Sequence, residues 1–328
     1  MNLGIGILIV VALLIIFSFI LLNKLYNVAI NSRTDKSFVL NANKNKTSNC
    51  ISETMEKEIQ WFQSYPKKEI YIESFNHLKL HGYQIKCNST SVDWVIISHG
   101  YFANAEQSSY VIHNFIEHDF NVLAIDARGH GKSSGDYIGL GWHDRIDIID
   151  WIKSINVSID SPNIVLYGIS MGAASTMMAS GETLPNNVRC IIADCGYTSI
   201  YEEFSYQLKK LYKLPSFPIL NMFDYYVKLK AGYSLKDVNA IKQLEKNKTP
   251  ILFIQGDQDM FVPSYMIEKL YNSTSTHKKK LIVKGAGHAE SYCKEEELYW
   301  STVYDFIKEY NIDSSKLSKL DKITMMNR

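Results

Sequence analysis

One stretch of the chain decides the fold, residues 163–172 with the sequence NIVLYGISMG. Its first half is apolar, which is typical of a strand buried on both faces. The residues that follow, 173–179, are small or apolar and predict a helix that packs closely against a sheet. A strand that turns directly into a helix, with Ser170 between two glycines at the turn, predicts a strained bend that exposes the serine hydroxyl.

The pattern Gly-x-Ser-x-Gly occurs twice, at residues 168–172 and 131–135. Further glycines follow the second copy, which is typical of a loop. That copy also resembles the end of a phosphate-binding loop, but the first glycine of such a loop would fall on Asp126 and no helix follows. We therefore take Ser170 as the candidate nucleophile, in a nucleophile elbow, and Ser133 as a loop residue.

Composition limits the class of protein. The 328 residues are 46% hydrophobic, enough for a large core, and the net charge of +1 gives no reason to expect a nucleic-acid partner. Five cysteines without metal-like spacing read as core or free thiols and leave the redox compartment open. We expect a small-molecule substrate, no cofactor and no metal, while the oligomeric state stays open.

The N-terminus carries a membrane-spanning candidate. Residues 3–22 contain no charge, and 20 helical residues reach across a hydrocarbon core of about 30 Å. No basic residue precedes the run and no small-x-small cleavage site follows it, which favours an uncleaved single-pass anchor over a signal peptide. Basic residues follow the span, so the positive-inside rule places the rest of the chain in the cytoplasm.

Strands and helices alternate along most of the chain. Two alternating stretches at 69–75 and 78–86 predict an antiparallel pair. After them, apolar runs alternate with helical patterns, which predicts a mostly parallel sheet wrapped by helices. The expected buried strands are 92–97, 122–125, 164–166, 190–193, 251–254 and 281–283, and the expected helices are 52–62, 108–117, 143–155, 173–180, 264–271 and 295–310.

One segment interrupts this alternation. Residues 197–248 lack a sheet-like run and carry ten tyrosines and phenylalanines, so we interpret them as a helical lid. An ordinary helical excursion with a packed apolar face is the alternative.

A serine nucleophile needs a base and a group that orients the base. Ligands meet at the carboxyl ends of parallel strands, and two loops qualify, at 255–259 and 285–288. The second supplies His288 as the base, with His130 as a second candidate. The first supplies Asp259 as the orienting acid, with Asp257 and then Asp194 as alternatives.

An oxyanion that develops on the substrate needs two amide donors. One is expected from Met171, the residue after the nucleophile, and one from Tyr101, which follows the strand at 92–97. The lysine run after His277 predicts a solvated turn.

These motifs together resemble the α/β-hydrolase family, in particular bacterial membrane-anchored hydrolases similar to serine aminopeptidases and prolyl oligopeptidases. They comprise His99-Gly100-Tyr101, residues 126–131, the elbow at 168–172, residues 256–259 with Val262-Pro263, and Gly287-His288. The resemblance implies an α/β-hydrolase fold with a helical lid insertion, and a Ser170, Asp259 and His288 triad.

The function expected from these residues is a serine hydrolase that cleaves a carboxylic ester with a hydrophobic acyl group. A peptidase acting on short peptides is the alternative, and an inactive binding protein on the same fold is a more distant one. The expected organisation is an anchor at 1–24, a polar linker at 25–50, the hydrolase domain at 51–312 with its lid at 197–248, and a polar tail at 313–328.

Overall fold

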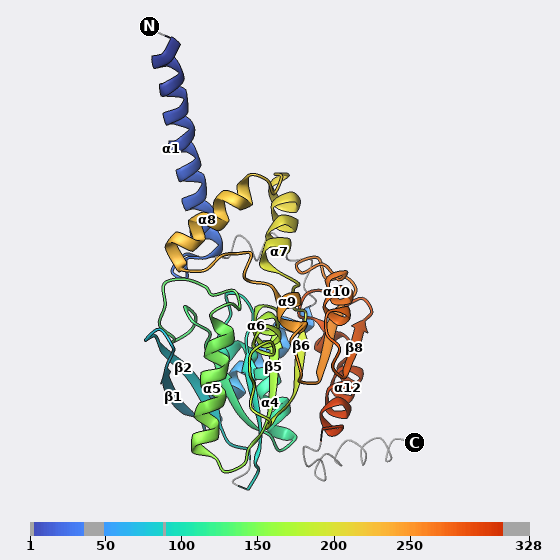
Figure 1. Ribbon diagram of the computed structural model, residues 1–328. Helices are drawn as coiled ribbons and strands as arrows, with labels where there is room; N and C mark the ends of the chain where they lie inside the picture. Colours follow the sequence, from blue (N-terminus) through green and yellow to red (C-terminus); the bar gives the residue numbers. More distant parts are fainter. Residues whose placement is uncertain (1–2, 36–48, 88–89, 311–328) are drawn as a thin grey trace.

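The computed structural model describes residues 3–35, 49–87 and 90–310. Its centre is one eight-stranded sheet in the order β1-β2-β4-β3-β5-β6-β7-β8, flanked by helices on both faces (Figure 1). The pairs β1–β2 and β2–β4 are antiparallel and all others are parallel. The fold is therefore the predicted mostly parallel α/β arrangement with one antiparallel edge.

Every strand expected from the sequence forms. The apolar runs become strands that are buried almost throughout, because helices cover both faces of a parallel sheet. The strands are β1 Lys68–Glu73, β2 Lys79–Ile85, β3 Asp93–Ser98, β4 Asn121–Ile125, β5 Asn163–Ile169, β6 Val188–Asp194, β7 Ile251–Gly256 and β8 Lys278–Val283.

One local prediction was wrong. The lysine run after His277 is not a turn but the first half of the edge strand β8, paired with β7 from Lys278 to Val283. Lysines suit an edge strand because their charged ends reach water and discourage pairing with another chain.

Two helical layers complete the core. On one face lie α5 and α6 with α9 and α10, and on the other lie α3, α4 and α12. The turn Ala105–Ser108 and the short helix α11, Ser291–Lys294, had no counterpart among the expected elements. The bounds of the core helices are α3 Asn49–Ser64, α4 Ser109–Glu117, α5 Asp144–Ser158, α6 Met171–Ala179, α9 Ala240–Leu244, α10 Met266–Asn272 and α12 Glu296–Lys308.

The segment between β6 and β7 is helical, as expected. It forms α7 (Ile200–Gln207), the π-helical turn η2 (Leu208–Tyr212) and α8 (Ile219–Ala231) before α9 returns the chain to the sheet. Figure 1 shows α7 and α8 above the carboxyl ends of the strands, beside the lower end of α1. We call residues 200–231 the cap.

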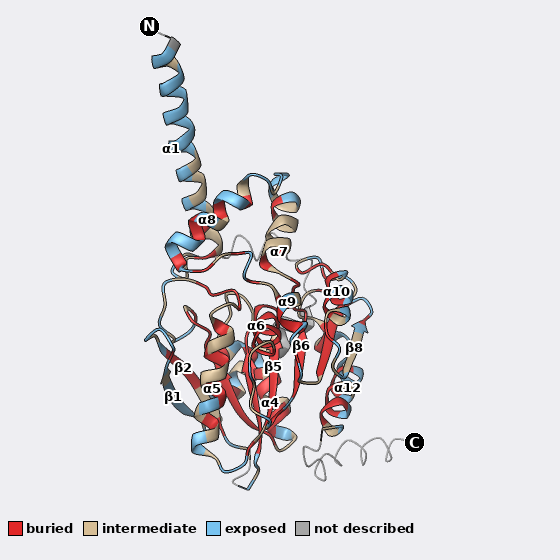
Figure 2. Ribbon diagram, in the orientation of Figure 1, coloured by how far each residue is buried: buried red, intermediate tan, exposed pale blue. Residues whose placement is uncertain are grey.

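The N-terminal helix α1 runs from Leu3 to Ala29, past residue 24 where the sequence ended the anchor. Its first five turns are exposed, whereas its last turn packs on the body of the protein (Figure 2). Ile30 is fully buried and its carbonyl accepts a hydrogen bond from the Ile138 amide. Residues 25–30 are thus part of the folded body and not a linker, because Tyr26 and Ile30 join the core. The predicted tail at 313–328 lies outside the described residues.

Candidate active site

Ser170 occupies a strained turn between β5 and α6. Its φ of 56° and ψ of −113° lie in a region that non-glycine residues rarely adopt. The flanking glycines are required by close approach: a Cβ on Gly168 would overlap the backbone of Gly172, and a Cβ on Gly172 would overlap the carbonyl oxygen of Ser98. The amide of Ser170 donates to the carbonyl of Asp194 at 2.8 Å. The turn is therefore held from both neighbouring strands.

The structure brings Ser170, His288 and Asp259 into one hydrogen-bonded chain. His288 Nε2 lies 2.9 Å from Ser170 Oγ, and His288 Nδ1 lies 2.7 Å from Asp259 Oδ2. Ser170 is 5% exposed and Asp259 is 3% exposed. The three side chains come from the ends of β5, β7 and β8, as expected for the carboxyl edge of a parallel sheet.

The carboxylate of Asp259 receives four donors. Oδ1 accepts from the amides of Phe261 and Val262, both at 2.9 Å, and Oδ2 accepts from Gln255 at 2.6 Å as well as from His288. These four contacts hold both carboxylate oxygens of Asp259 in place beside the imidazole.

Asp257 and Asp194, the alternative candidates for the orienting acid, form hydrogen bonds elsewhere. Asp257 Oδ1 accepts from the amide of Gly285 at 2.6 Å and so fixes a turn. Asp194 Oδ2 accepts from the hydroxyl of Tyr299 at 2.9 Å, and burial raises the pKa of Asp194 to about 7. Neither has a hydrogen bond to His288 among the described contacts, so the geometry favours Asp259.

The charge of Asp259 tunes the base. Burial lowers the pKa of His288, but the Asp259 carboxylate and the nearby Cys195 together raise that pKa well above its usual range. A more basic imidazole takes a proton from a hydroxyl more readily.

The amides of Tyr101 and Met171 flank Ser170. A Cβ on Gly100 would lie 3.5 Å from the Cβ of Ser170, so the loop after β3 contacts the elbow. In the described part of the chain neither amide donates a hydrogen bond to protein, and Met171 is the first residue of α6, whose positive end faces the same place. The two donors are therefore available to an oxyanion beside Ser170.

His130, the second candidate base, has another task. Its Nε2 accepts from the amide of Phe102 at 3.2 Å, next to Tyr101. The neighbouring His99 accepts at Nε2 from Ala127 at 3.0 Å, and burial lowers its pKa to about 4, which keeps it neutral and able to accept. Both histidines hold the loops after β3 and β4 in position.

The other copy of the serine motif is a loop, as expected. Ser133 Oγ donates to the carbonyl of Asp126 at 2.7 Å and accepts from the amide of His81 at 2.8 Å. These bonds join the loop after β4 to β2 and leave Ser133 no base.

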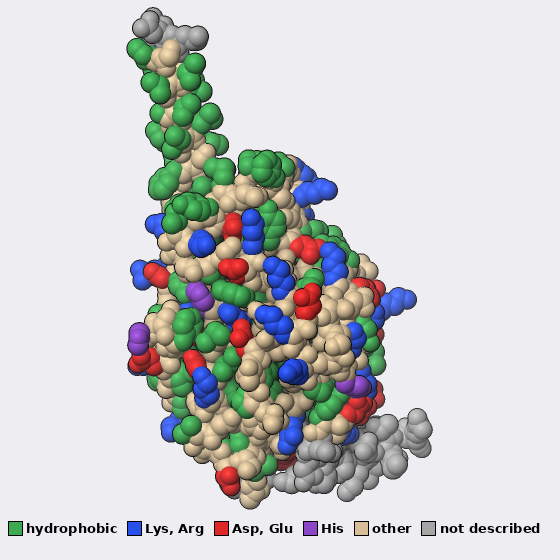
Figure 3. Space-filling model, viewed as in Figure 1, with side chains coloured by type: hydrophobic (Ala, Val, Ile, Leu, Met, Phe, Trp, Pro, Cys, Tyr) green, Lys and Arg blue, Asp and Glu red, His purple; other side chains and the backbone are tan. Residues whose placement is uncertain are grey.

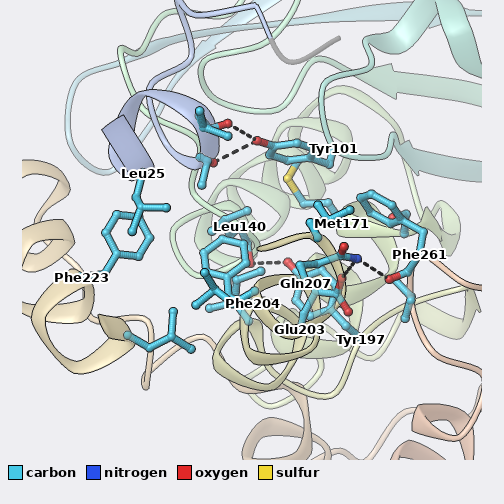
Figure 4. A pocket seen from close by; sticks show the side chains of 18 of the residues that line it. Leu25, Tyr101, Leu140, Met171, Tyr197, Glu203, Phe204, Gln207, Phe223 and Phe261 are labelled. Atoms are coloured by element: carbon cyan, nitrogen blue, oxygen red, sulfur yellow. Dashed lines mark hydrogen bonds between the residues drawn. The ribbon is translucent and has the colours of Figure 1, made fainter. Parts of the chain in front are cut away.

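An apolar pocket opens beside Ser170. The cap supplies one wall with Phe204 and Phe223, and the last turns of α1 supply another with Leu25, Val28 and Ala29 (Figure 4). Tyr101 closes the gap between α1 and the elbow, since its hydroxyl donates to the carbonyls of Val28 at 3.2 Å and Ala29 at 3.1 Å.

One carboxyl lines this apolar pocket. Glu203 on α7 is 4% exposed, and burial raises its pKa to about 8. Its Oε1 accepts from Gln207, which also donates to the carbonyl of Phe261, while Oε2 has no hydrogen-bond partner among the residues that the structure describes. Nothing in the sequence distinguished Glu203 from other helical glutamates, since its burial depends on how the cap folds back on the sheet.

A second pocket is also lined by Ser170. It is lined by His288, Gly287 and Glu290 from the loop after β8, and by Gln107 and Tyr110 from the segment after β3. Ser170 therefore lines both a nearly all-apolar pocket and a more polar one.

Comparisons with known proteins agree on one family. A family model described as serine aminopeptidase S33 matches residues 90–223. The uncharacterized protein YqkD of Bacillus subtilis is 29% identical over 251 residues, 76% of this chain and 82% of YqkD. The crystal structure of the Pyrococcus furiosus esterase Pf2001 superposes with a TM-score of 0.62, covering 76% of this chain and 93% of that one at 24% identity. The chain has the α/β-hydrolase fold, and these likenesses support its membership of the α/β-hydrolase family.

A further relative of this α/β hydrolase carries an assigned activity. The lysophosphatidylserine lipase ABHD12 of Xenopus tropicalis is 26% identical over 160 residues, 47% of this chain and 39% of that protein. In this chain, the region that the family model matches contains the elbow at residues 168–172, whereas Asp259 and His288 lie after that region. Together with the family model, these likenesses support a serine hydrolase enzyme.

Proposed function

We propose that this α/β hydrolase cleaves carboxylic esters of hydrophobic acyl groups at a membrane, with Ser170 as nucleophile. The observation that carries the proposal is that Ser170, which is hydrogen-bonded to His288, lines an apolar pocket built from the cap and α1. A lipase and an esterase among the similar proteins support the same class of substrate.

The geometry supports a two-step reaction. Ser170 Oγ attacks the acyl carbonyl and its proton passes to His288 Nε2, while Asp259 holds the imidazolium. The amides of Tyr101 and Met171 stabilise the oxyanion, and His288 then protonates the leaving alcohol as the acyl-enzyme forms. In the second step a water molecule attacks the acyl-enzyme while His288 accepts its proton, and the carboxylic acid is released from Ser170.

The two pockets suggest where each part of the substrate binds. The acyl chain fits the apolar pocket beneath the cap, and the alcohol fits the more polar pocket next to His288. The cap then acts as the lid. A single apolar helix, Gly4–Ala29, indicates membrane association, and we propose that it crosses the bilayer once with the catalytic domain in the cytoplasm.

The test uses a fluorophosphonate probe and two matched serine variants. We expect the full-length enzyme and Ser133→Ala to label equally, and Ser170→Ala to lose labelling. Labelling of Ser170→Ala at the wild-type rate would exclude the mechanism, and an unreactive wild type would favour the inactive binding protein.

Substrate class is tested separately. Hydrolysis of p-nitrophenyl esters is expected to rise in kcat/KM with acyl length, because each buried CH₂ contributes about 0.8 kcal/mol. Cleavage of aminoacyl anilides without cleavage of the esters would instead establish the peptidase.

A further inference from the structure

The cap exposes an apolar surface that the fold leaves uncovered. Outside α1, six of the large apolar side chains exposed in the described residues lie between positions 212 and 229. They are Tyr212, Leu214, Phe217, Met222, Tyr225 and Leu229. Soluble surfaces rarely gather apolar side chains so closely, and such a patch marks a contact with something apolar.

The helix α8 is apolar on two sides. Leu220, Phe223 and Tyr226 are buried toward the body and α1, whereas Tyr225 and Leu229 are 66% and 68% exposed. A helix with apolar residues on both sides is stable when both are covered. The body covers the first, so the second requires a further apolar environment.

The position of α1 identifies that environment. Residues 3–22 of α1 span about 30 Å, the thickness of a hydrocarbon core, and the polar residues Asn23 and Lys24 follow them. Tyr226 of α8 donates to Asn23 Oδ1 at 3.1 Å and packs edge-on against Phe19, one turn further into the apolar stretch. If α1 crosses a bilayer, α8 is held at the bilayer surface.

We propose that the exposed face of the cap is seated in the same lipid leaflet through which α1 enters the bilayer. Figure 3 shows apolar side chains over the cap continuing onto the base of α1. Lys228 and Lys230 are exposed on either side of Leu229, as in interfacial helices whose lysines reach the headgroups.

The same surface contains an edge of the pocket. Tyr212 is 42% exposed and also lines the cavity beside Ser170. A lipid-seated cap therefore gives an acyl chain a route from the leaflet into the pocket without crossing water. This consequence rests on the proposed function, whereas the seating of the cap rests only on α1 and α8.

The experiment measures depth in the bilayer and not hydrolysis. Full-length protein carrying one added tryptophan is reconstituted into phosphatidylcholine and phosphatidylglycerol vesicles, with or without bromine on the acyl chains, and quenching beyond that of the parent protein is recorded. The variants are Phe17→Trp in the apolar part of α1, Tyr225→Trp on the cap, and Val157→Trp. Val157 is 89% exposed and lies near the C-terminal end of α5. This helix begins four residues after Leu140, which lines the pocket, and Val157 lies about 20 Å along the helix from that start.

We expect bromine to quench Phe17→Trp, to quench Tyr225→Trp by at least about half as much, and to leave Val157→Trp like the parent. Quenching at position 17 without quenching at 225 overturns the seated cap and leaves the anchor in place. An unquenched tryptophan at position 17 overturns both, while the fluorophosphonate test of Ser170 stands unaffected. Equal quenching at position 157 would mean non-specific adsorption and also overturns the proposal.

Discussion

Replacing Asp259 with Asn tests how the base is oriented. An asparagine in this place has one acceptor oxygen where the carboxylate has two. If that oxygen keeps the two amide donors at positions 261 and 262, the new NH₂ group faces His288 Nδ1 and Gln255. The side chain of Gln255 can turn its own oxygen toward the NH₂ group, so this orientation leaves fewer buried donors unpaired than its opposite.

The consequence falls on His288. With a donor next to Nδ1, the imidazole carries its proton on Nε2, which then cannot accept the proton of Ser170. We expect kcat/KM for a short p-nitrophenyl ester to fall by about 10⁴, equivalent to about 5 kcal/mol of transition-state stabilisation. The midpoint of thermal unfolding, measured in the same detergent, separates this effect from misfolding.

A matched variant, Asp257→Asn, serves as the control for Asp259→Asn. Asp257→Asn keeps the acceptor for the Gly285 amide, and we expect kcat/KM to change by less than about threefold. If Asp257→Asn lost more activity than Asp259→Asn, the assignment of the orienting acid would be refuted.

Three further variants probe the surroundings of the site. Tyr101→Phe removes the hydroxyl that binds the last carbonyls of α1, and should lower the unfolding free energy by about 1 kcal/mol. Fluorophosphonate labelling should keep its rate, since the proposed oxyanion donor is the Tyr101 amide. Glu203 keeps its proton in the folded state up to about pH 8 but ionises near its ordinary pKa when unfolded, so wild-type stability falls as pH rises through this window. Denaturation of Glu203→Gln should therefore show a stability advantage that grows by about 1 kcal/mol per pH unit from pH 5 to 8, and a constant difference would contradict the buried proton. Gly172→Ala should yield no folded, labelled enzyme because its Cβ would overlap the Ser98 carbonyl, whereas Gly232→Ala, where a Cβ meets nothing within 4 Å, should fold at a cost of about 1 kcal/mol for its positive φ.

The sheet and the elbow were predictable because their signals are local. Each buried strand is a continuous apolar run, and loops at the ends of parallel strands share one edge of the sheet, so Asp259 and His288 could be placed near Ser170 without coordinates. The choice between Asp259 and Asp257 could not be made in this way. It depends on which carboxylate faces the imidazole, a matter of side-chain direction within a single turn.

Features that depend on packing between distant segments could not be predicted from the sequence. The residues after position 24 looked like the start of a linker because hydropathy falls there, yet Tyr26 and Ile30 are buried in the core. No pattern in the sequence marks Glu203, which the fold of the cap turns into the pocket. In both cases the partner lies far away in the chain and no local pattern records it.

The end of α1 gives the anchor a second role. Leu25, Val28 and Ala29 form a wall of the pocket, and Tyr101 connects that wall to the loop after β3, which carries the proposed oxyanion donor. The helix that indicates membrane association is thus also part of the cavity in which Ser170 lies. Because a wall of the pocket continues directly into α1, the depth of the anchor in a bilayer would set the height of the pocket above the acyl chains, which ties substrate access to membrane position.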